Sequence, residues 1–159
     1  MPQPALSVDH VALRIYDAEA TQRFYSDVLG LTLVGALSGP DWEGKPWLMM
    51  MYEIADGRQL VLCALRGSKR PAVRDDVTHY ALSVATRADQ EAWCQRLELK
   101  GVPFREEDHG AQKSIYFEDP NGITLEITTP DSHRATLPDA GAQQLVRRWI
   151  AEDAPRSST

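Results

Sequence analysis

Hydrophobic and polar residues alternate along two stretches of this chain that resemble each other. His10 begins the first stretch, His-Val-Ala-Leu-Arg-Ile, and His79 begins the second, His-Tyr-Ala-Leu-Ser-Val. Alternation with a period of two is typical of a half-buried strand. Each stretch is followed by a helical pattern that ends at a glycine, Gly30 or Gly101. The pattern therefore predicts two copies of one module, with a histidine at the start of the same strand in each.

The first module is predicted to occupy residues 1–66 in the order β-α-β-β-β. Asp17 is a good N-cap for a helix that places Phe24, Tyr25, Val28 and Leu29 on its inner face. Strands are predicted at residues 7–15, 31–37, 47–54 and 59–65. The sequence Gly-Pro-Asp-Trp-Glu-Gly predicts a loop between the second and third strands, and Asp56-Gly57 predicts a turn before the fourth.

The second module is predicted at residues 77–130, after a polar linker at 67–76. Thr86 and Asp89 form a capping-box pattern at the start of its helix. Strands are predicted at residues 78–84, 102–105, 113–118 and 123–129, with Asp-Pro-Asn-Gly at 119–122 as a turn. The C-terminal extension, 131–159, is predicted to hold a short helix at about 139–151 and a frayed tail.

Composition and charge narrow the functional classes. The chain has 159 residues, of which 43% are hydrophobic, and a net charge of −6. These values suit one core and disfavour nucleic acid as a partner. No apolar run is long enough for a membrane span, and Cys63 and Cys94 have no disulfide-like spacing, so a reduced, cytoplasmic location is expected. Unpaired strand edges predict a homodimer, with the modules paired either within one chain or across two.

The candidate chemistry follows from laying one module over the other. Glu126 lies four residues after Gly122, on the strand face that carries threonines. A carboxylate in such surroundings needs a partner, and a cation shared with His10 and His79 would satisfy it. The same count from Gly57 reaches Val61. The repeat therefore predicts two histidines and one carboxylate that could share a cation, with a hydrocarbon at the position in the first module that is equivalent to Glu126.

Three motifs resemble the vicinal oxygen chelate superfamily, which includes glyoxalase I, fosfomycin-resistance transferases, bleomycin-resistance proteins and extradiol dioxygenases. They are Val-Asp-His-Val-Ala-Leu, Arg-Phe-Tyr-Ser-Asp-Val-Leu-Gly-Leu, and Ser-Ile-Tyr-Phe-Glu-Asp-Pro-Asn-Gly-Ile-Thr-Leu-Glu. The resemblance covers about residues 7–129. It implies an α+β fold of two β-α-β-β-β modules whose mixed sheet forms an open cup around a metal site. It also implies that His10, His79 and Glu126 are the metal ligands.

The fourth position separates branches of this superfamily. Glyoxalase I resembles the epimerases in placing Glu or Gln there, whereas the count in this chain gives Val61. A shift of two residues would supply Gln59 instead. Without it, two histidines and one carboxylate resemble the facial triad of non-haem Fe(II) sites. Fe(II) is therefore the expected metal, with Mn(II), Ni(II) and Zn(II) as alternatives.

Two further residues are catalytic candidates through the same resemblance. Tyr116 stands where extradiol dioxygenases carry an active-site tyrosine, and His109 lies near their acid–base histidine. The plain alternatives are that Tyr116 is a strand aromatic and that His109 is a solvated loop residue. Trp42 and Trp47 are either part of a substrate wall or ordinary loop and core residues, and Cys63 is expected to be buried and inert.

The expected function is that of a metal-dependent dioxygenase acting on a vicinal diol or hydroxylated aromatic. One alternative is a glyoxalase-like lyase or isomerase, or a fosfomycin-type thiol transferase, which also needs only three protein ligands. A second is a non-catalytic drug-binding protein resembling the bleomycin-resistance proteins. In every case the partner is a small molecule, and no organic cofactor is expected.

Overall fold

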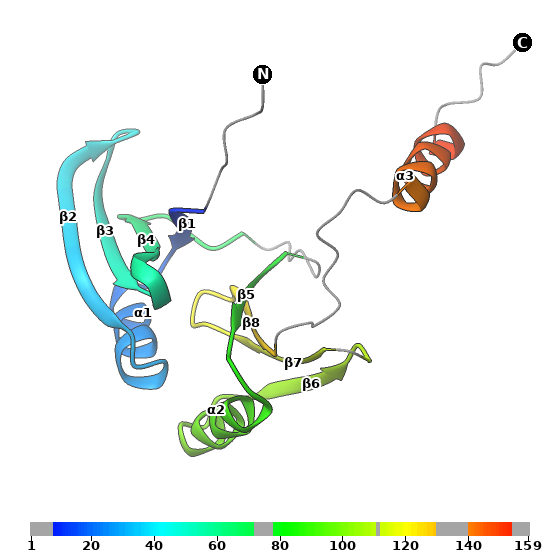
Figure 1. Ribbon diagram of the computed structural model, residues 1–159. Helices are drawn as coiled ribbons and strands as arrows, with labels where there is room; N and C mark the ends of the chain where they lie inside the picture. Colours follow the sequence, from blue (N-terminus) through cyan, green and yellow to red (C-terminus); the bar gives the residue numbers. More distant parts are fainter. Residues whose placement is uncertain (1–7, 72–77, 111, 130–139, 154–159) are drawn as a thin grey trace, which may run out of the picture.

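The computed structural model describes residues 8–71, 78–110, 112–129 and 140–153, which form two four-stranded sheets (Figure 1). The first sheet has the order β1-β4-β3-β2, from β1 (His10–Ile15), β2 (Thr32–Trp42), β3 (Lys45–Glu53) and β4 (Gln59–Leu65). The second has the order β5-β8-β7-β6, from β5 (His79–Ser83), β6 (Phe104–Asp108), β7 (Lys113–Glu118) and β8 (Thr124–Thr128). In each sheet the first pair is parallel and the others are antiparallel. The repeat predicted from the sequence is therefore a repeat of topology.

Each sheet has one helix after its first strand. Helix α1 (Ala18–Arg23) begins at Asp17, whose side chain accepts a hydrogen bond from the Ala20 N–H, and continues as a π-helical segment, η1 (Phe24–Val28). Helix α2 (Arg87–Leu99) begins with the predicted capping box of Thr86 and Asp89. A short 3₁₀ segment, η2 (Ala55–Gly57), precedes β4, and α3 (Ala140–Asp153) lies in the C-terminal extension. Among the described segments, no helix has the length and apolar character of a membrane span.

The hairpin β2–β3 is longer than the sequence pattern indicates. Residues 39–42, expected in a loop, continue β2, and the chain reverses at Glu43 and Gly44, whose φ angles are 55° and 76°. The Asp41 side chain accepts a hydrogen bond from the Gly44 N–H at 2.7 Å and closes this turn. Pairing across the hairpin thus outweighs the local turn signal of Gly39 and Pro40. Residues 72–76 of the predicted linker and the segment before α3 lie outside the described residues.

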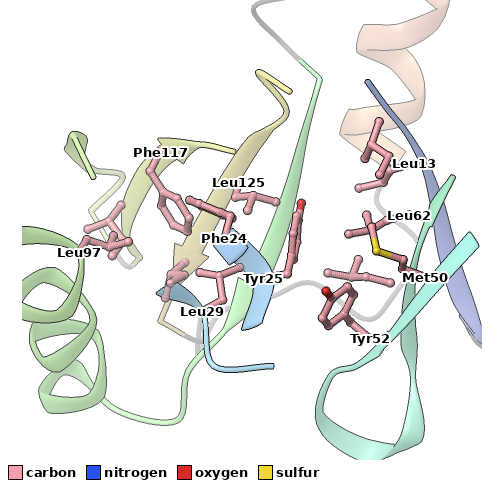
Figure 2. Packing of buried hydrophobic residues seen from close by; sticks show 14 residues of the cluster. Leu13, Phe24, Tyr25, Leu29, Met50, Tyr52, Leu62, Leu97, Phe117 and Leu125 are labelled. Atoms are coloured by element: carbon pink, nitrogen blue, oxygen red, sulfur yellow. The ribbon is translucent and has the colours of Figure 1, made fainter. Parts of the chain in front are cut away.

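The hydrophobic core joins the two halves of the chain. Figure 2 shows Phe24, Tyr25 and Leu29 between residues of the first sheet and residues of the second half. The first-sheet residues are Leu13, Met50, Tyr52 and Leu62, and those of the second half are Leu97, Phe117 and Leu125. The ring of Phe24 lies 6.3 Å from that of Phe117, and the ring of Tyr25 lies 5.6 Å from that of Tyr52. Helix α1 and η1 are therefore packed between the sheets.

Helix α1 and η1 together form one helical segment, which we call the inner helix. Polar side chains from the second half of the chain form hydrogen bonds with both of its ends. Asn121 accepts hydrogen bonds from the N–H groups of Tyr16 and Asp17, at 2.7 and 3.2 Å, and donates to Thr21 Oγ1 at 2.8 Å. At the other end, the Arg96 guanidinium donates to the carbonyl oxygens of Val28 and Asp27. The backbone groups that Asn121 and Arg96 bind lie at helix ends, where N–H and C=O groups lack intrahelical partners. The two modules are therefore fixed relative to each other.

Because successive side chains of a strand point to opposite faces of the sheet, every second side chain points away from the core. We call the sheet faces turned away from the shared core the outer faces. The outer face of the first sheet carries His10, Ala12 and Arg14 from β1, Gln59, Val61 and Cys63 from β4, and Met49 and Met51 from β3. The outer face of the second sheet carries His79, Thr124, Glu126, Thr128, Ser114 and Tyr116. All predicted metal ligands lie on outer faces.

Candidate metal and catalytic site

His79 and Glu126 form the centre of the site. Because β5 and β8 pair in parallel with Ala81 opposite Glu126, the side chains of His79 and Glu126 lie on the same face of the sheet. His79 Nε2 lies 2.9 Å from Glu126 Oε2. Glu126 is only 5% exposed, and its other carboxylate oxygen accepts a hydrogen bond from the Ser114 hydroxyl. This is a buried carboxylate held from both sides, with a histidine at the solvent edge.

Tyr116 lies beside this pair, on β7 directly opposite Glu126. Its ring meets the His79 ring edge-to-face, with centroids 5.6 Å apart, and the Arg105 guanidinium lies 4.6 Å from its centroid. Burial, and then the negative charge of Glu126, raise the pKa of the Tyr116 phenol. The hydroxyl therefore keeps its proton at neutral pH and is available as a hydrogen-bond donor.

His109 reaches the same cluster from the β6–β7 connection. Its Nε2 lies 3.3 Å from the Tyr116 hydroxyl and 3.7 Å from Glu107 Oε2. A hydrogen bond from Arg105 lowers the pKa of the Glu107 carboxyl, which keeps a negative charge near the imidazole. His109 is thus half-exposed, as a loop histidine would be, yet it contacts the predicted catalytic tyrosine. The structure brings together four of the five predicted site residues.

His10 is the fifth, and it lies on the other sheet. Its Nδ1 is 2.7 Å from the Asp9 carboxylate, and its side chain is 53% exposed. Within the ranges that the structure describes, no three His, Cys, Asp or Glu side chains are placed to hold one metal ion. In one chain the candidate metal ligands therefore lie in two groups, which we call half-sites: His79 with Glu126 on one outer face and His10 on the other.

The strand registers show which residue of the first sheet is equivalent to Glu126, the position at which a fourth metal ligand could stand. His10 pairs with Gln59 as His79 pairs with Thr124, and Ala12 pairs with Val61 as Ala81 pairs with Glu126. Val61 is thus the structural counterpart of Glu126, as counting from the turn glycines indicates. Gln59 is the counterpart of Thr124. Its role as a fourth ligand stays a prediction.

A cleft of about 550 Å³ is lined by residues of β1, β5, β6, β7 and β8, and by none of the five candidate site residues. Its lining includes Ala12 and Thr124, which share the outer faces of His10 and Glu126, respectively. Three arginines also line it: Arg14, Arg70 and Arg105. The guanidinium groups outnumber the one carboxylate of the lining, Glu118. The cleft is therefore suited to a negatively charged small molecule.

Sequence reasoning missed Ser114 and Arg105. Ser114 lies two residues before Tyr116 on the same strand face, so alternation would have placed it beside Glu126. Arg105 has no such signal, because its position over the Tyr116 ring depends on the pairing of β6 with β7. Cys63, which was expected to be buried, is half-buried on the outer face that carries Val61. Partial burial raises the pKa of both the Cys63 and Cys94 thiols. Trp42 and Trp47 form an edge-to-face pair near the hairpin end.

Two mixed sheets of this topology, with a histidine–carboxylate pair on an outer face, define a protein built from paired β-α-β-β-β modules. The sequence model of the Glyoxalase/Bleomycin resistance protein/Dioxygenase superfamily matches residues 7–127, so this chain belongs to that superfamily. The resemblance carried by the three sequence motifs is thereby confirmed. The C-terminal extension lies outside the matched segment.

Three curated relatives represent two kinds of enzyme. The chain is 32% identical over 123 residues to the glutathione transferase FosA of Serratia marcescens, covering 76% of this chain and 79% of FosA. It is 28% identical over 141 residues to the metallothiol transferase FosB of Staphylococcus epidermidis, covering 84% of each. It is 24% identical over 136 residues to MhqO of Bacillus subtilis, a putative ring-cleaving dioxygenase, covering 85% of this chain and 44% of MhqO. The sequence identity of this chain is higher to the two transferases than to MhqO, which favours the transferase alternative over the expected dioxygenase.

Solved structures share the fold. FosX of Listeria monocytogenes, a fosfomycin resistance protein crystallised with Mn(II) and sulfate, matches with a TM-score of 0.61 and 17% identity, covering 80% of this chain and 94% of FosX. Lactoylglutathione lyase of Agrobacterium tumefaciens matches with a TM-score of 0.63 and 20% identity, covering 84% of this chain and 100% of the lyase. The predicted α+β fold of paired modules is thus confirmed.

Proposed function

We propose that this protein is a metal-dependent thiol transferase that acts on a small, oxygen-bearing substrate. The observation that carries the proposal is the 32% identity to the glutathione transferase FosA over 76% of this chain. The arginine-lined cleft supports it, because thiols such as glutathione carry carboxylates. This reading replaces the dioxygenase as the first candidate.

The experiment that tests this function compares two reactions of the metal-loaded protein. Loss of glutathione thiol is followed with fosfomycin, and O₂ uptake is followed with a panel of catechols and hydroquinones. Thiol consumption without O₂ uptake is the expected result. The reverse result would overturn the transferase and restore the dioxygenase, which the Tyr116–His109 contact and the similarity to MhqO favour as the second candidate.

The donor set of the two half-sites fits a divalent metal. Imidazole nitrogens and one carboxylate suit Mn(II), Fe(II), Ni(II) or Zn(II), and we assign His10, His79 and Glu126 as the ligands. FosX holds Mn(II), so Mn(II) is the first metal to test. A bound divalent metal would act as a Lewis acid on a substrate oxygen.

Completing this site requires a second copy of the chain. The inner helix and its polar contacts hold the two sheets together by their core faces, and the outer faces turn away from that contact. β1 and β5 lie at the edges of their sheets and begin with His10 and His79, and an edge strand is a common place for pairing with another chain. We propose that β1 of one chain lies beside β5 of its partner, in a two-fold dimer with two identical sites.

Mixing two inactive variants tests this arrangement. His10→Ala and Glu126→Ala chains are refolded together in equal amounts, and bound metal is measured. Random pairing makes half of the dimers mixed, and each mixed dimer has one intact site and one doubly damaged site. Metal content is therefore expected to recover to about a quarter of the wild-type value. If the three ligands came from one chain, the mixture would recover nothing.

The residues around the metal ligands have defined tasks in a thiol transfer. The thiol loses its proton as its sulfur bonds to carbon and a carbon–oxygen bond breaks. Negative charge develops on the departing oxygen, which takes up one proton, so the proton lost by the thiol balances the hydroxyl formed. In this proposal the Tyr116 hydroxyl donates a hydrogen bond to this oxygen, and His109, whose Nε2 lies 3.3 Å from that hydroxyl, exchanges a proton with Tyr116.

Tyr116→Phe is expected to lower turnover without releasing the metal. Loss of one donor to a developing negative charge typically costs about 100-fold in kcat, whereas metal content and fold should be unchanged. Tyr52→Phe is the matched control, since Tyr52 is fully buried in the core on β3 and does not line the cleft. Equal kcat values for the two variants, measured by thiol consumption, would exclude the assigned role.

A further inference from the structure

The outer faces of the two sheets differ in chemistry at equivalent positions. In the second sheet, Tyr116 lies opposite Glu126, and Ser114 lies opposite Thr128. In the first sheet, the positions equivalent to Glu126, Tyr116 and Ser114 hold Val61, Met51 and Met49. Three polar site residues are thus replaced by three apolar ones.

These apolar residues form one continuous surface, which we call the apolar wall: Leu37, Met49, Met51, Val61 and Cys63. Met51 pairs with Val61, and Met49 pairs with both Cys63 and Leu37, so the five lie on three neighbouring strands. The Met51 side chain lies across Gly35, where an added Cβ would stand 3.0 Å from the Met51 methyl carbon. Leu37 is 56% exposed and the other four are half-buried. The wall is therefore accessible in this chain.

The wall is continuous with a half-site. Ala12 pairs with Val61 on the same face that carries His10, two residues earlier on β1. A substrate whose oxygens reach the metal site would therefore meet hydrocarbon on one side and polar side chains on the other. Methionine side chains are unbranched and polarisable, which lets them adapt to the shape of a bound group.

We infer that the substrate of this site carries an apolar ring or chain beside its metal-binding oxygens, and that the apolar wall binds this part. The inference rests on the proposed metal site and adds the substrate class. It predicts a preference for substrates with a longer apolar part over fosfomycin, whose only apolar substituent is a methyl group. The occupant is a small molecule, and the exposed apolar residues of α3 are the competing occupant to be tested.

The experiment uses methionine-methyl NMR on the full-length, zinc-loaded protein. Acetohydroxamate and hexanohydroxamate both offer two vicinal oxygens to the metal and differ only in chain length. Hexanohydroxamate is expected to shift the Met49 and Met51 methyl signals and to bind at least tenfold more tightly, because each buried methylene adds about threefold to fourfold. Met50 is the internal control, since it is 5% exposed and points into the core (Figure 2).

Two glutamine variants make the test specific. Met49→Gln/Met51→Gln should bind acetohydroxamate as the wild type does while losing most of the preference for the longer chain. Leu145→Gln, on the exposed face of α3, should leave that preference unchanged. Equal affinity for the two hydroxamates, or a preference that survives in the double variant, would overturn the inference. Movement of the Met49 and Met51 signals in ligand-free Leu145→Gln would also overturn it, because α3 would then cover the wall.

The metal site and the apolar wall are tested separately. If zinc or acetohydroxamate does not bind, the proposed metal site is wrong, and hexanol added to the metal-free protein still tests the wall. Hexanol should shift Met49 and Met51 but not Met50. Absence of those shifts would contradict the wall independently of the metal.

Discussion

Replacing Glu126 by alanine is expected to lower the affinity for a divalent metal by more than about 100-fold. Glu126 is the only carboxylate assigned to the site, and it lies 2.9 Å from the assigned ligand His79. Its loss should exceed the 10–100-fold effect that is typical of residues that only orient a ligand. Titration of the metal-free protein with Mn(II), followed by calorimetry or by the electron paramagnetic resonance of free Mn(II), measures the change.

Ser114→Ala is the graded control for this prediction. Its hydroxyl donates to the Glu126 carboxylate without being an assigned ligand, so the variant should weaken metal binding by about 10-fold to 100-fold. If Glu126→Ala bound the metal with the affinity of the wild type, Glu126 would be excluded as a metal ligand. Equal losses in the two variants would mean that Glu126 acts only through the fold, which circular dichroism of both proteins would check.

Asn121→Ala is expected to lower the free energy of unfolding by about 3–5 kcal/mol, because it leaves several buried polar groups without partners. The side chain is 5% exposed and accepts from the backbone N–H groups of Tyr16 and Asp17. It also donates to Thr21 and to Asp119. Urea unfolding at a fixed protein concentration measures the loss, since dimerisation would shift apparent stability.

Asp41→Ala is the control for that loss. The Asp41 side chain also accepts a backbone N–H, that of Gly44, but at an exposed turn, so its removal should cost below about 1 kcal/mol. Similar costs for the two variants would mean that the contact between the second-half turn and the inner helix does not stabilise the fold. A large cost confined to Asn121→Ala would identify this turn as the link between the modules.

Features that depend on short-range periodicity could be predicted from the order of residues alone. Alternation with a period of two predicts which residues share a strand face, so it placed Glu126 among threonines and Val61 at the equivalent position. Local hydrogen-bonding chemistry predicted the caps at Asp17 and Thr86, which the structure confirms. The internal repeat predicted the order of strands and helices in both halves.

The tertiary structure decided what depends on packing between distant segments. The π-helical η1 and the extended β2–β3 hairpin arise from contacts that no local pattern encodes. The separation of His10 from the His79–Glu126 pair follows from the inner helix, which packs both core faces together and turns the outer faces away. A period of two tells which face a side chain occupies, but only the packing of the sheets tells which faces meet.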